Sequence, residues 1–425
     1  MVANEILAIV MAGGSGERLQ PLTRGRSKGA VPFGGKFRLI DITLSNCVNS
    51  GLRRIYVLTQ YLSESLNRHI QEGWAISSAG LGDYIYCIPA QQKLGAEWYR
   101  GTADAVRQNL DLIRRKDVDD VLILSGDHVY KMNYSQFVAH HRMKKSGLTI
   151  SAVRVRKELA SERLGVLEID HDHRLIGFEE KPVQPKTLAD APDYALVSMG
   201  IYVFEVDTLL QALQAKGQDF GKDIIPEMIG GAHDIFVYDY EEENNIQDLE
   251  VMVKDGIREK KLAHKTRDSS YWKDVGSVDS YYEASLELVS VDPLFSLYGE
   301  RWPLRTFQRP LPPSKCVLGG KISDSIISDG CIISGGTVEN SILSPGVIVE
   351  RDAVVAQSVI FDDVVIEPGA NVKRAILDKK CRIQAGASIG YDREADEQRG
   401  CLISNNGVVV VPKGIHVRRT EPPPF

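Results

Sequence analysis

The stretch that decides the fold runs from Ile6 to Arg18 and reads Ile-Leu-Ala-Ile-Val-Met-Ala-Gly-Gly-Ser-Gly-Glu-Arg. A continuous apolar run that stops at glycines is typical of a buried parallel strand leading into a tight loop. Glycine lets the backbone N–H groups of such a loop come close to an anion, and an arginine adds a fork of donors. We therefore predict that Gly13, Gly14 and Gly16 form a phosphate-binding loop.

Two common phosphate motifs do not fit this stretch. The dinucleotide fingerprint needs a third glycine three residues after its second, but Leu19 stands there. A Walker A motif needs Ser or Thr after Gly-Lys, and Gly35-Lys36 is followed by Phe37. The remaining alternative is a turn that binds nothing, and the nearby Lys28 favours a nucleotide-phosphate role instead.

Strand and helix patterns alternate over the first 125 residues. This alternation predicts an α/β fold with an open, mostly parallel sheet, which binds ligands at the carboxyl ends of its strands. The expected strands are Ile6–Met11, Arg54–Thr59, Tyr84–Pro89 and Val121–Leu124, and the expected helices are Arg38–Ser50, Ser63–Trp74 and Thr102–Lys116.

The next segment changes to strands, with a hairpin turn expected at Asp170–Arg174. The expected strands are Thr149–Val155, Gly165–Ile169, Leu175–Glu180 and Met199–Phe204, and a helix over Asp279–Ser290 follows. Residues 291–316 contain five prolines and are predicted to be an extended linker.

A new period begins after the linker. Ile326, Ile342, Val359 and Ile376 are 16, 17 and 17 residues apart, and a second apolar column keeps the same spacing. Hexapeptide-type repeats build parallel β-helices, so we predict one of roughly four coils. The alternative is a β-sandwich with evenly spaced strands.

The motif Gly13-Gly14-Ser-Gly16-Glu-Arg18-Leu, followed by Lys28 and Phe33-Gly34-Gly35-Lys36, resembles the start of the sugar-nucleotide pyrophosphorylases, specifically the glucose-1-phosphate adenylyltransferases. Later motifs extend the resemblance over nearly the whole chain. It implies a Rossmann-like nucleotidyltransferase domain with a mostly parallel mixed sheet at 1–290, a linker at 291–316 and a left-handed parallel β-helix at 317–425 for regulation and oligomerisation. The implied reaction converts ATP and α-D-glucose 1-phosphate into ADP-glucose and pyrophosphate.

The resemblance also assigns roles to individual residues. Asp127 directly follows a buried strand, where an aspartate can bind a metal or cap a turn, and the resemblance makes Asp127 and Asp274 the ligands of Mg²⁺. Arg18, Lys28, Asp127 and Asp274 are the implied catalytic residues. The implied ATP-binding residues are Gly13, Gly14, Gly16, Arg18, Gln91, Gly101 and Thr102. The implied glucose 1-phosphate-binding residues are Tyr99, Gly165, Glu180, Lys181, Ser198 and Tyr202.

From the residues alone, some of these assignments have ordinary structural alternatives. Gly101-Thr102 also fits a helix start, Tyr99 a half-buried aromatic, and Glu180-Lys181 a surface ion pair. The chain departs from the family pattern at Gly29, where a proline usually follows the lysine that matches Lys28.

Regulated members of the family bind anionic effectors through basic residues. One branch carries an effector-binding lysine where this chain has Gly25, and the candidate replacements are Arg24 and Arg26. Arg38, Lys379 and Lys413 are further candidates for binding a phosphorylated metabolite, with ordinary surface residues as the alternative.

Bulk properties exclude several classes of protein. A formal net charge of −6 argues against nucleic acid as a partner, and no stretch resembles a membrane span. Six scattered cysteines without a C-x-x-C pair favour reduced thiols in the cytoplasm over a zinc site.

The family resemblance leaves the oligomeric state and the exact function open to alternatives. We expect a homotetramer, or a heterotetramer with a paralogous subunit. The alternative functions are a pyrophosphorylase for UTP or dTTP, and a non-catalytic regulatory subunit.

Overall fold

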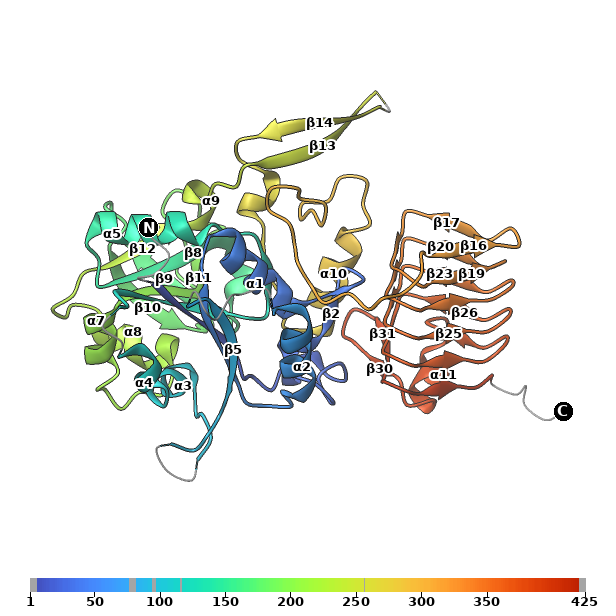
Figure 1. Ribbon diagram of the computed structural model, residues 1–425, viewed down its shortest axis with the longest axis horizontal. Helices are drawn as coiled ribbons and strands as arrows, with labels where there is room; N and C mark the ends of the chain where they lie inside the picture. Colours follow the sequence, from blue (N-terminus) through green and yellow to red (C-terminus); the bar gives the residue numbers. More distant parts are fainter. Residues whose placement is uncertain (1–5, 76–81, 94–96, 115–116, 256, 420–425) are drawn as a thin grey trace.

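The computed structural model describes residues 6–75, 82–93, 97–114, 117–255 and 257–419. An α/β part and a stack of short strands lie side by side, joined by a long connection (Figure 1). In the part of the chain described, no helix is both long and apolar enough to span a bilayer.

The α/β part is built on a nine-stranded mixed sheet, as expected. β1 (Ile6–Ala12) lies at its centre and pairs in parallel with β4 (Arg54–Thr59) and β6 (Asp120–Ser125). β5 (Tyr84–Pro89) continues this parallel half beyond β4. The glycine loop and Asp127 therefore follow neighbouring strands at the same edge of the sheet.

The other half of the sheet is antiparallel. β11 (Tyr194–Glu205) pairs with both β6 and β8 (Leu148–Arg156), and β9 (Gly165–Ile169) forms the expected hairpin with β10 (Leu175–Glu180). β11 is longer than predicted because a register shift between Ser198 and Tyr202 breaks its alternating pattern. The sequence analysis missed β12 (Ile235–Asp239), which pairs with β8.

The expected helices α1 (Leu39–Asn49), α2 (Glu64–Gly73) and α10 (Val278–Glu287) are present. The prediction of one helix over Thr102–Lys116 is wrong, because α3 (Thr102–Arg107) and α4 (Leu110–Ile113) are separate helices. The side chain of Asn109 lies at the break and donates to the carbonyl oxygen of Ala105 at 2.8 Å, which competes with helix propagation. Residues 115–116 lie outside the described part of the chain.

Further elements of this part were not predicted. They are β2 (Pro32–Phe33), β3 (Phe37–Arg38), β7 (His128–Tyr130), α5 (Tyr134–Lys144), α6 (Lys157–Ala160), α7 (Val206–Ala212), α9 (Tyr240–Glu243) and β15 (Trp272–Asp274). Residues 219–226 do predict a helix start, and α8 (Ile225–Met228) follows a helical turn capped by Asp219. β13 (Asp248–Lys254) and β14 (Ile257–Ala263) form a hairpin that stands out from the body of the molecule (Figure 1).

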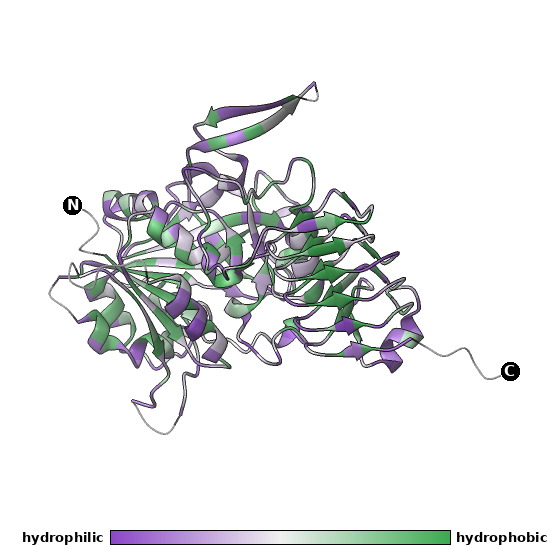
Figure 2. Cartoon of the chain, turned by 45° about the vertical axis from the view of Figure 1, so that its right-hand side comes forward, coloured by the Kyte–Doolittle hydropathy of each residue, from purple (hydrophilic) through white to green (hydrophobic). Residues whose placement is uncertain are grey.

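The C-terminal part is a parallel β-helix with three stacks of strands, as predicted. The first stack is β16 (Lys315–Val317), β19 (Ile332–Ser334), β22 (Ile348–Val349), β25 (Val365–Ile366), β28 (Arg382–Ile383) and β32 (His416–Val417). The second is β17 (Lys321–Ser323), β20 (Thr337–Glu339), β23 (Val354–Ala356), β26 (Asn371–Lys373) and β29 (Ser388–Ile389). The third is β18 (Ile326–Ile327), β21 (Ile342–Leu343), β24 (Val359–Ile360), β27 (Ala375–Leu377), β31 (Val409–Val411) and β30 (Leu402–Ile403). Figure 2 shows hydrophobic residues gathered along these strands.

The β-helix is deeper than the roughly four coils that we expected. One stack holds six parallel strands, another holds five, and the third holds five parallel strands together with the antiparallel β30. The repeat is hidden near its end because α11 (Arg393–Gln398) and β30 are inserted, so Ile376 pairs with Val410 instead of a residue 17 positions later.

The β-helix packs directly on the α/β part. Ile342, Val359 and Ile376 belong to the same buried cluster as Tyr281 of α10. Tyr282 donates a hydrogen bond to the carbonyl oxygen of Gln357 at 2.7 Å. Burial of this continuous apolar surface holds the two parts together.

Candidate functional site

The glycine loop turns sharply after β1 and contacts the segment that carries Lys28. Gly16 has φ of 63°, a left-handed conformation that strains other residues. A Cβ at this position would lie 3.2 Å from Cβ of Lys28. The hydroxyl of Thr23 donates to the carbonyl oxygen of Gly16 at 2.9 Å, which fixes the loop.

Lys28 lies between the two predicted metal-binding carboxylates. Its Nζ is 3.1 Å from Oδ2 of Asp127 and 3.0 Å from Oδ1 of Asp274. The structure thus brings these two carboxylates together at one point beside the glycine loop, as predicted from their motifs.

Strand pairing explains how residues so far apart in sequence meet. β15 pairs antiparallel with β7, and this register places Asp274 opposite His128. Asp127 directly precedes β7. The alignment of the two short strands therefore sets the spacing between the carboxylates.

Lys28 and the two aspartates stabilise one another in their charged forms. Burial opposes the charge of Lys28, but the carboxylates of Asp127 and Asp274 outweigh burial and raise the pKa of the Lys28 amine. Burial likewise opposes ionisation of both aspartates, yet Lys28 outweighs it and lowers the pKa of each carboxyl group. All three groups are therefore charged at neutral pH.

The donor set suits a divalent cation. Enzymes that act on nucleotides commonly bind Mg²⁺ through one or two carboxylates together with substrate phosphates. The two ionised aspartates that converge here are ligands of this kind. Among the described residues, no group of three or more His, Cys, Asp or Glu side chains could hold a metal ion by itself. A metal here would therefore need oxygens from a substrate or from water.

A pocket of about 250 Å³ opens beside the carboxylates. Its lining includes seven further predicted site residues, namely Arg18, Thr102, Gly165, Glu180, Lys181, Ser198 and Tyr202. A Cβ on Gly165 would lie 2.6 Å from the ring of Phe178 and 2.8 Å from Oε2 of Glu180. Only glycine fits there without a shift of the neighbouring side chains.

The remaining predicted substrate residues lie outside this lining. Tyr99 pairs through its backbone with the side chain of Gln60, which also lies against Gly13. A Cβ on Gly101 would lie 2.4 Å from the carbonyl oxygen of Gln218, so this glycine permits a close backbone approach. Gln91 is exposed, and Gly14 has open space around it.

Sequence reasoning missed three residues that line the pocket. The sequence analysis assigned no role to His128, which follows Asp127, or to Asp219. Arg163 was not singled out at all, because it belongs to no motif that we used.

Three of the effector candidates lie where the two parts of the chain meet, and Lys413 is an exception. Arg26 donates to Asp378 of the β-helix at 2.7 and 3.0 Å, and both side chains are buried. Lys379 pairs with Asp362 at 3.0 Å, and burial lowers the pKa of its amine. Arg38 donates to the carbonyl oxygen of Ser65 at 2.8 Å. Lys413 is exposed.

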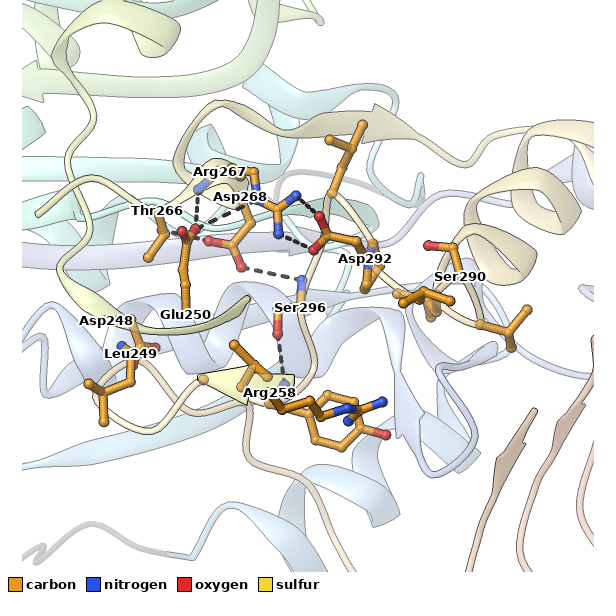
Figure 3. A pocket seen from close by; sticks show the side chains of 18 of the residues that line it. Asp248, Leu249, Glu250, Arg258, Thr266, Arg267, Asp268, Ser290, Asp292 and Ser296 are labelled. Carbon is orange, nitrogen blue, oxygen red and sulfur yellow. Dashed lines mark hydrogen bonds and ion pairs between the residues drawn. The ribbon is translucent and has the colours of Figure 1, made fainter. Parts of the chain in front are cut away.

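Another pocket, with a volume of about 640 Å³, lies between the β13–β14 hairpin and the segment after α10. Figure 3 shows that its charged groups engage one another: Arg267 pairs with Asp292, and the backbone N–H of Arg267 donates to Glu250 at 2.7 Å. Asp268 accepts from the backbone N–H of Ser296 at 3.3 Å. These pairs leave little unsatisfied charge for a ligand, so we place the function at the smaller pocket.

Comparison with known proteins agrees with this geometry. Residues 7–290 match the family model described as nucleotidyl transferase, and residues 312–411 match the model described as GlmU-like, C-terminal hexapeptide. The first match contains both carboxylates and the pocket, and the second covers most of the β-helix.

Several curated proteins are similar over nearly the whole chain. Glucose-1-phosphate adenylyltransferase 2 of Alkalilimnicola ehrlichii is 43% identical over 415 residues, which cover 95% of this chain and 93% of the relative. Glucose-1-phosphate adenylyltransferase of Cutibacterium acnes is 43% identical, with 97% and 98% covered. That of Alteromonas mediterranea is 41% identical, with 96% and 92% covered. The chain therefore belongs to the glucose-1-phosphate adenylyltransferase family of nucleotidyl transferases.

Proposed function

We propose that this protein transfers the adenylyl group of ATP to the phosphate of α-D-glucose 1-phosphate, giving ADP-glucose and pyrophosphate for α-glucan synthesis. The observation that carries the proposal is the convergence of Asp127, Asp274 and Lys28 between a glycine loop and a pocket lined by the sugar-site motifs. The family relationship adds the identity of the substrates.

The reaction needs no nucleophilic side chain. An oxygen of the glucose 1-phosphate is already an anion at neutral pH, and it attacks the α-phosphorus of ATP. The bond between the α-phosphorus and the bridging oxygen of pyrophosphate breaks, and the leaving group takes the electron pair. The protein therefore contributes alignment and charge stabilisation.

Each residue of the site has a proposed part in this alignment. The glycine loop and Arg18 would hold the phosphates of ATP, and Lys28 would add positive charge beside the departing pyrophosphate. Lys181, Ser198 and Tyr202 would hold the sugar phosphate. Further roles would fall to the other residues predicted from the motifs, namely Tyr99, Gly165 and Glu180 on the sugar side and Gln91, Gly101 and Thr102 on the nucleotide side.

Asp127 and Asp274 would bind Mg²⁺, which supplies positive charge against the phosphates when it is bound. A related divalent ion would fit the same donors. Measuring activity with Mg²⁺ and with other divalent ions therefore tests the proposal of Mg²⁺.

We also propose regulation by a phosphorylated metabolite, with Arg26, Arg38 and Lys379 at the contact between the two parts, together with the exposed Lys413, as its basic groups. The division into a catalytic domain at 1–290, a linker at 291–316 and a β-helix at 317–425 belongs to this proposal. So do tetrameric assembly, with identical or paralogous subunits, and a cytoplasmic location.

The direct test is pyrophosphate release by the purified chain alone, with glucose 1-phosphate and either ATP, UTP or dTTP. We expect turnover with ATP and at least about tenfold lower kcat/KM with the other two nucleotides, a ratio equivalent to about 1.4 kcal/mol. Higher kcat/KM with UTP or dTTP would indicate a different pyrophosphorylase. Absence of turnover with every nucleotide would indicate a non-catalytic subunit.

A further inference from the structure

The pocket beside Asp274 contains three cationic side chains, and two of them already contact acids. Lys181 lies 2.9 Å from Oε1 of Glu180, and Arg18 lies 3.9 Å from Oδ2 of Asp274. The third is Arg163, which is exposed and lines the same pocket. Within the described residues, no acidic partner of the Arg163 guanidinium occurs.

The remaining carboxylate of the lining has other partners. Asp219 accepts hydrogen bonds from the backbone N–H groups of Gly221 and Lys222, at 3.0 and 3.1 Å. It also accepts from the hydroxyl of Thr102 at 2.9 Å. This carboxylate therefore caps a turn, and the charge of Arg163 remains available to a ligand.

Backbone hydrogen bonds hold Arg163 beside Lys181. The N–H of Lys181 donates to the carbonyl oxygen of Leu164 at 3.2 Å, and the N–H of Glu162 donates to that of Pro182 at 2.9 Å. The two segments are thus paired on both sides of Arg163. Lys181 itself has φ of 51°, a conformation uncommon for a residue with a side chain, and this pairing supports it.

We infer that Arg163 is a substrate-binding residue that holds the phosphate of the sugar 1-phosphate together with Lys181. A guanidinium group presents two parallel N–H donors that match two oxygens of one phosphate, whereas an ammonium group acts as a point charge. Because a phosphate monoester is a dianion at neutral pH, it can engage both cations at once. The inference rests on the proposed function and specifies which group of the substrate this end of the pocket recognises.

The test compares Arg163→Ala, Arg163→Lys and the unaltered enzyme in steady-state kinetics with each substrate varied in turn. We expect Arg163→Ala to raise KM for glucose 1-phosphate by about 10- to 100-fold, in the range of a lost hydrogen bond to a charged group. The KM for ATP should change less than about threefold, because the contact is made with the other substrate. Arg163→Lys should recover part of the loss, since it keeps the charge without the fork.

Lys222→Ala is the matched control, because Lys222 is an exposed cation next to Gly221 of the lining but outside the lining itself. Its KM values should equal those of the unaltered enzyme. The inference is overturned if Arg163→Ala leaves KM for glucose 1-phosphate unchanged, if it raises both KM values equally, or if Lys222→Ala has the same effect. Arg163→Lys serves as the test variant if the alanine variant does not fold.

A second measurement separates this inference from the proposed function. Calorimetry can follow the binding of glucose 1-phosphate to the full-length protein in the presence of Mg²⁺ and a non-cleavable α,β-methylene analogue of ATP. Weaker binding to Arg163→Ala supports the inference even if the unaltered protein shows no turnover, in which case only the proposed reaction fails. Equal binding to both proteins overturns the inference whether or not the protein is active.

Discussion

The amine of Lys28 lies 3.0 Å from a carboxylate oxygen of Asp274, although 246 residues separate the two in the sequence. The contact joins the segment after the glycine loop to the strand that precedes the last helix of the α/β part. With Asp127 on its other side, Lys28 offsets two partly buried negative charges.

Replacement of Lys28 should disable the enzyme. Lys28→Ala leaves two partly buried carboxylates without their cation and removes a positive charge from the reacting phosphates, so we expect kcat to fall about 10²- to 10³-fold, as for a lost oxyanion donor. The measurement is pyrophosphate release at saturating substrates. Lys36→Ala, which removes an exposed cation eight residues later in the sequence, should keep full activity. Equal activity of Lys28→Ala and Lys36→Ala would show that Lys28 has no catalytic part.

The buried pair between Arg26 and Asp378 should contribute strongly to stability. Removal of one partner leaves an uncompensated buried charge, so Arg26→Ala or Asp378→Ala should each lower the free energy of unfolding by about 3–5 kcal/mol. Urea unfolding at a fixed protein concentration measures this, and the double variant should cost less than the sum of the two single variants.

The exposed pair between Arg309 and Asp363, 3.1 Å apart, provides the control for this experiment. It also connects the segment before the β-helix to the β-helix itself, but water screens it, so Arg309→Ala should cost less than about 1 kcal/mol. Equal costs for Arg26→Ala and Arg309→Ala would contradict the role of the buried pair.

His141 should make stability depend on pH. Burial, followed by Arg142 and His140, lowers its pKa from 6.5 to about 4. The unfolded chain then binds the proton more tightly than the folded one, so the stability contribution is complete above pH 6.5 and is lost as the pH falls toward 4. At pH 5 this one group accounts for a loss of about 2 kcal/mol.

His141→Gln keeps a neutral polar side chain near the Thr149 hydroxyl, 2.8 Å from the histidine ring. Its free energy of unfolding should therefore fall less than that of the unaltered protein between pH 7 and pH 5. Parallel losses in the two proteins, measured by urea unfolding in the same buffers, would show that another group causes the acid sensitivity.

The effector proposal predicts a specific loss of response. If Lys379 and Lys413 bind a phosphorylated metabolite, their joint replacement by alanine should abolish activation or inhibition by every sugar phosphate in a panel, while activity without effector stays within about twofold. Activity assays with and without each metabolite measure this. A response that is unchanged for all metabolites would contradict the assignment.

The sequence predicted the main sheet well, because its parallel strands are continuous apolar runs that end at glycine or polar residues. It also predicted that Asp127 and Asp274 meet, but only through their motifs. The pairing of β15 with β7 that brings them together involves strands of three residues, too short for a periodic pattern.

Other features carried no signal of this kind. The strand Ile257–Ala263 has four charged residues among seven and shows no apolar alternation, so the hairpin was missed. The break between α3 and α4 depends on a local bond of the Asn109 side chain, which competes with the helix pattern. Arg163 is an isolated arginine in sequence, and only the structure shows that it lines the pocket.

The central claim is that two carboxylates from distant parts of the chain bind one divalent ion, and metal-dependent activity of paired variants tests it most directly. We predict that the unaltered protein releases pyrophosphate from ATP and glucose 1-phosphate only with Mg²⁺ or a similar ion. Asp127→Ala and Asp274→Ala should each remain folded and lose at least about 100-fold in kcat, and the double variant should be little worse than either, because the residues act as a unit. Asp119→Ala, an exposed aspartate near the opposite end of β6, should keep full activity. Retention of most of the activity by Asp127→Ala with Mg²⁺ would contradict the account.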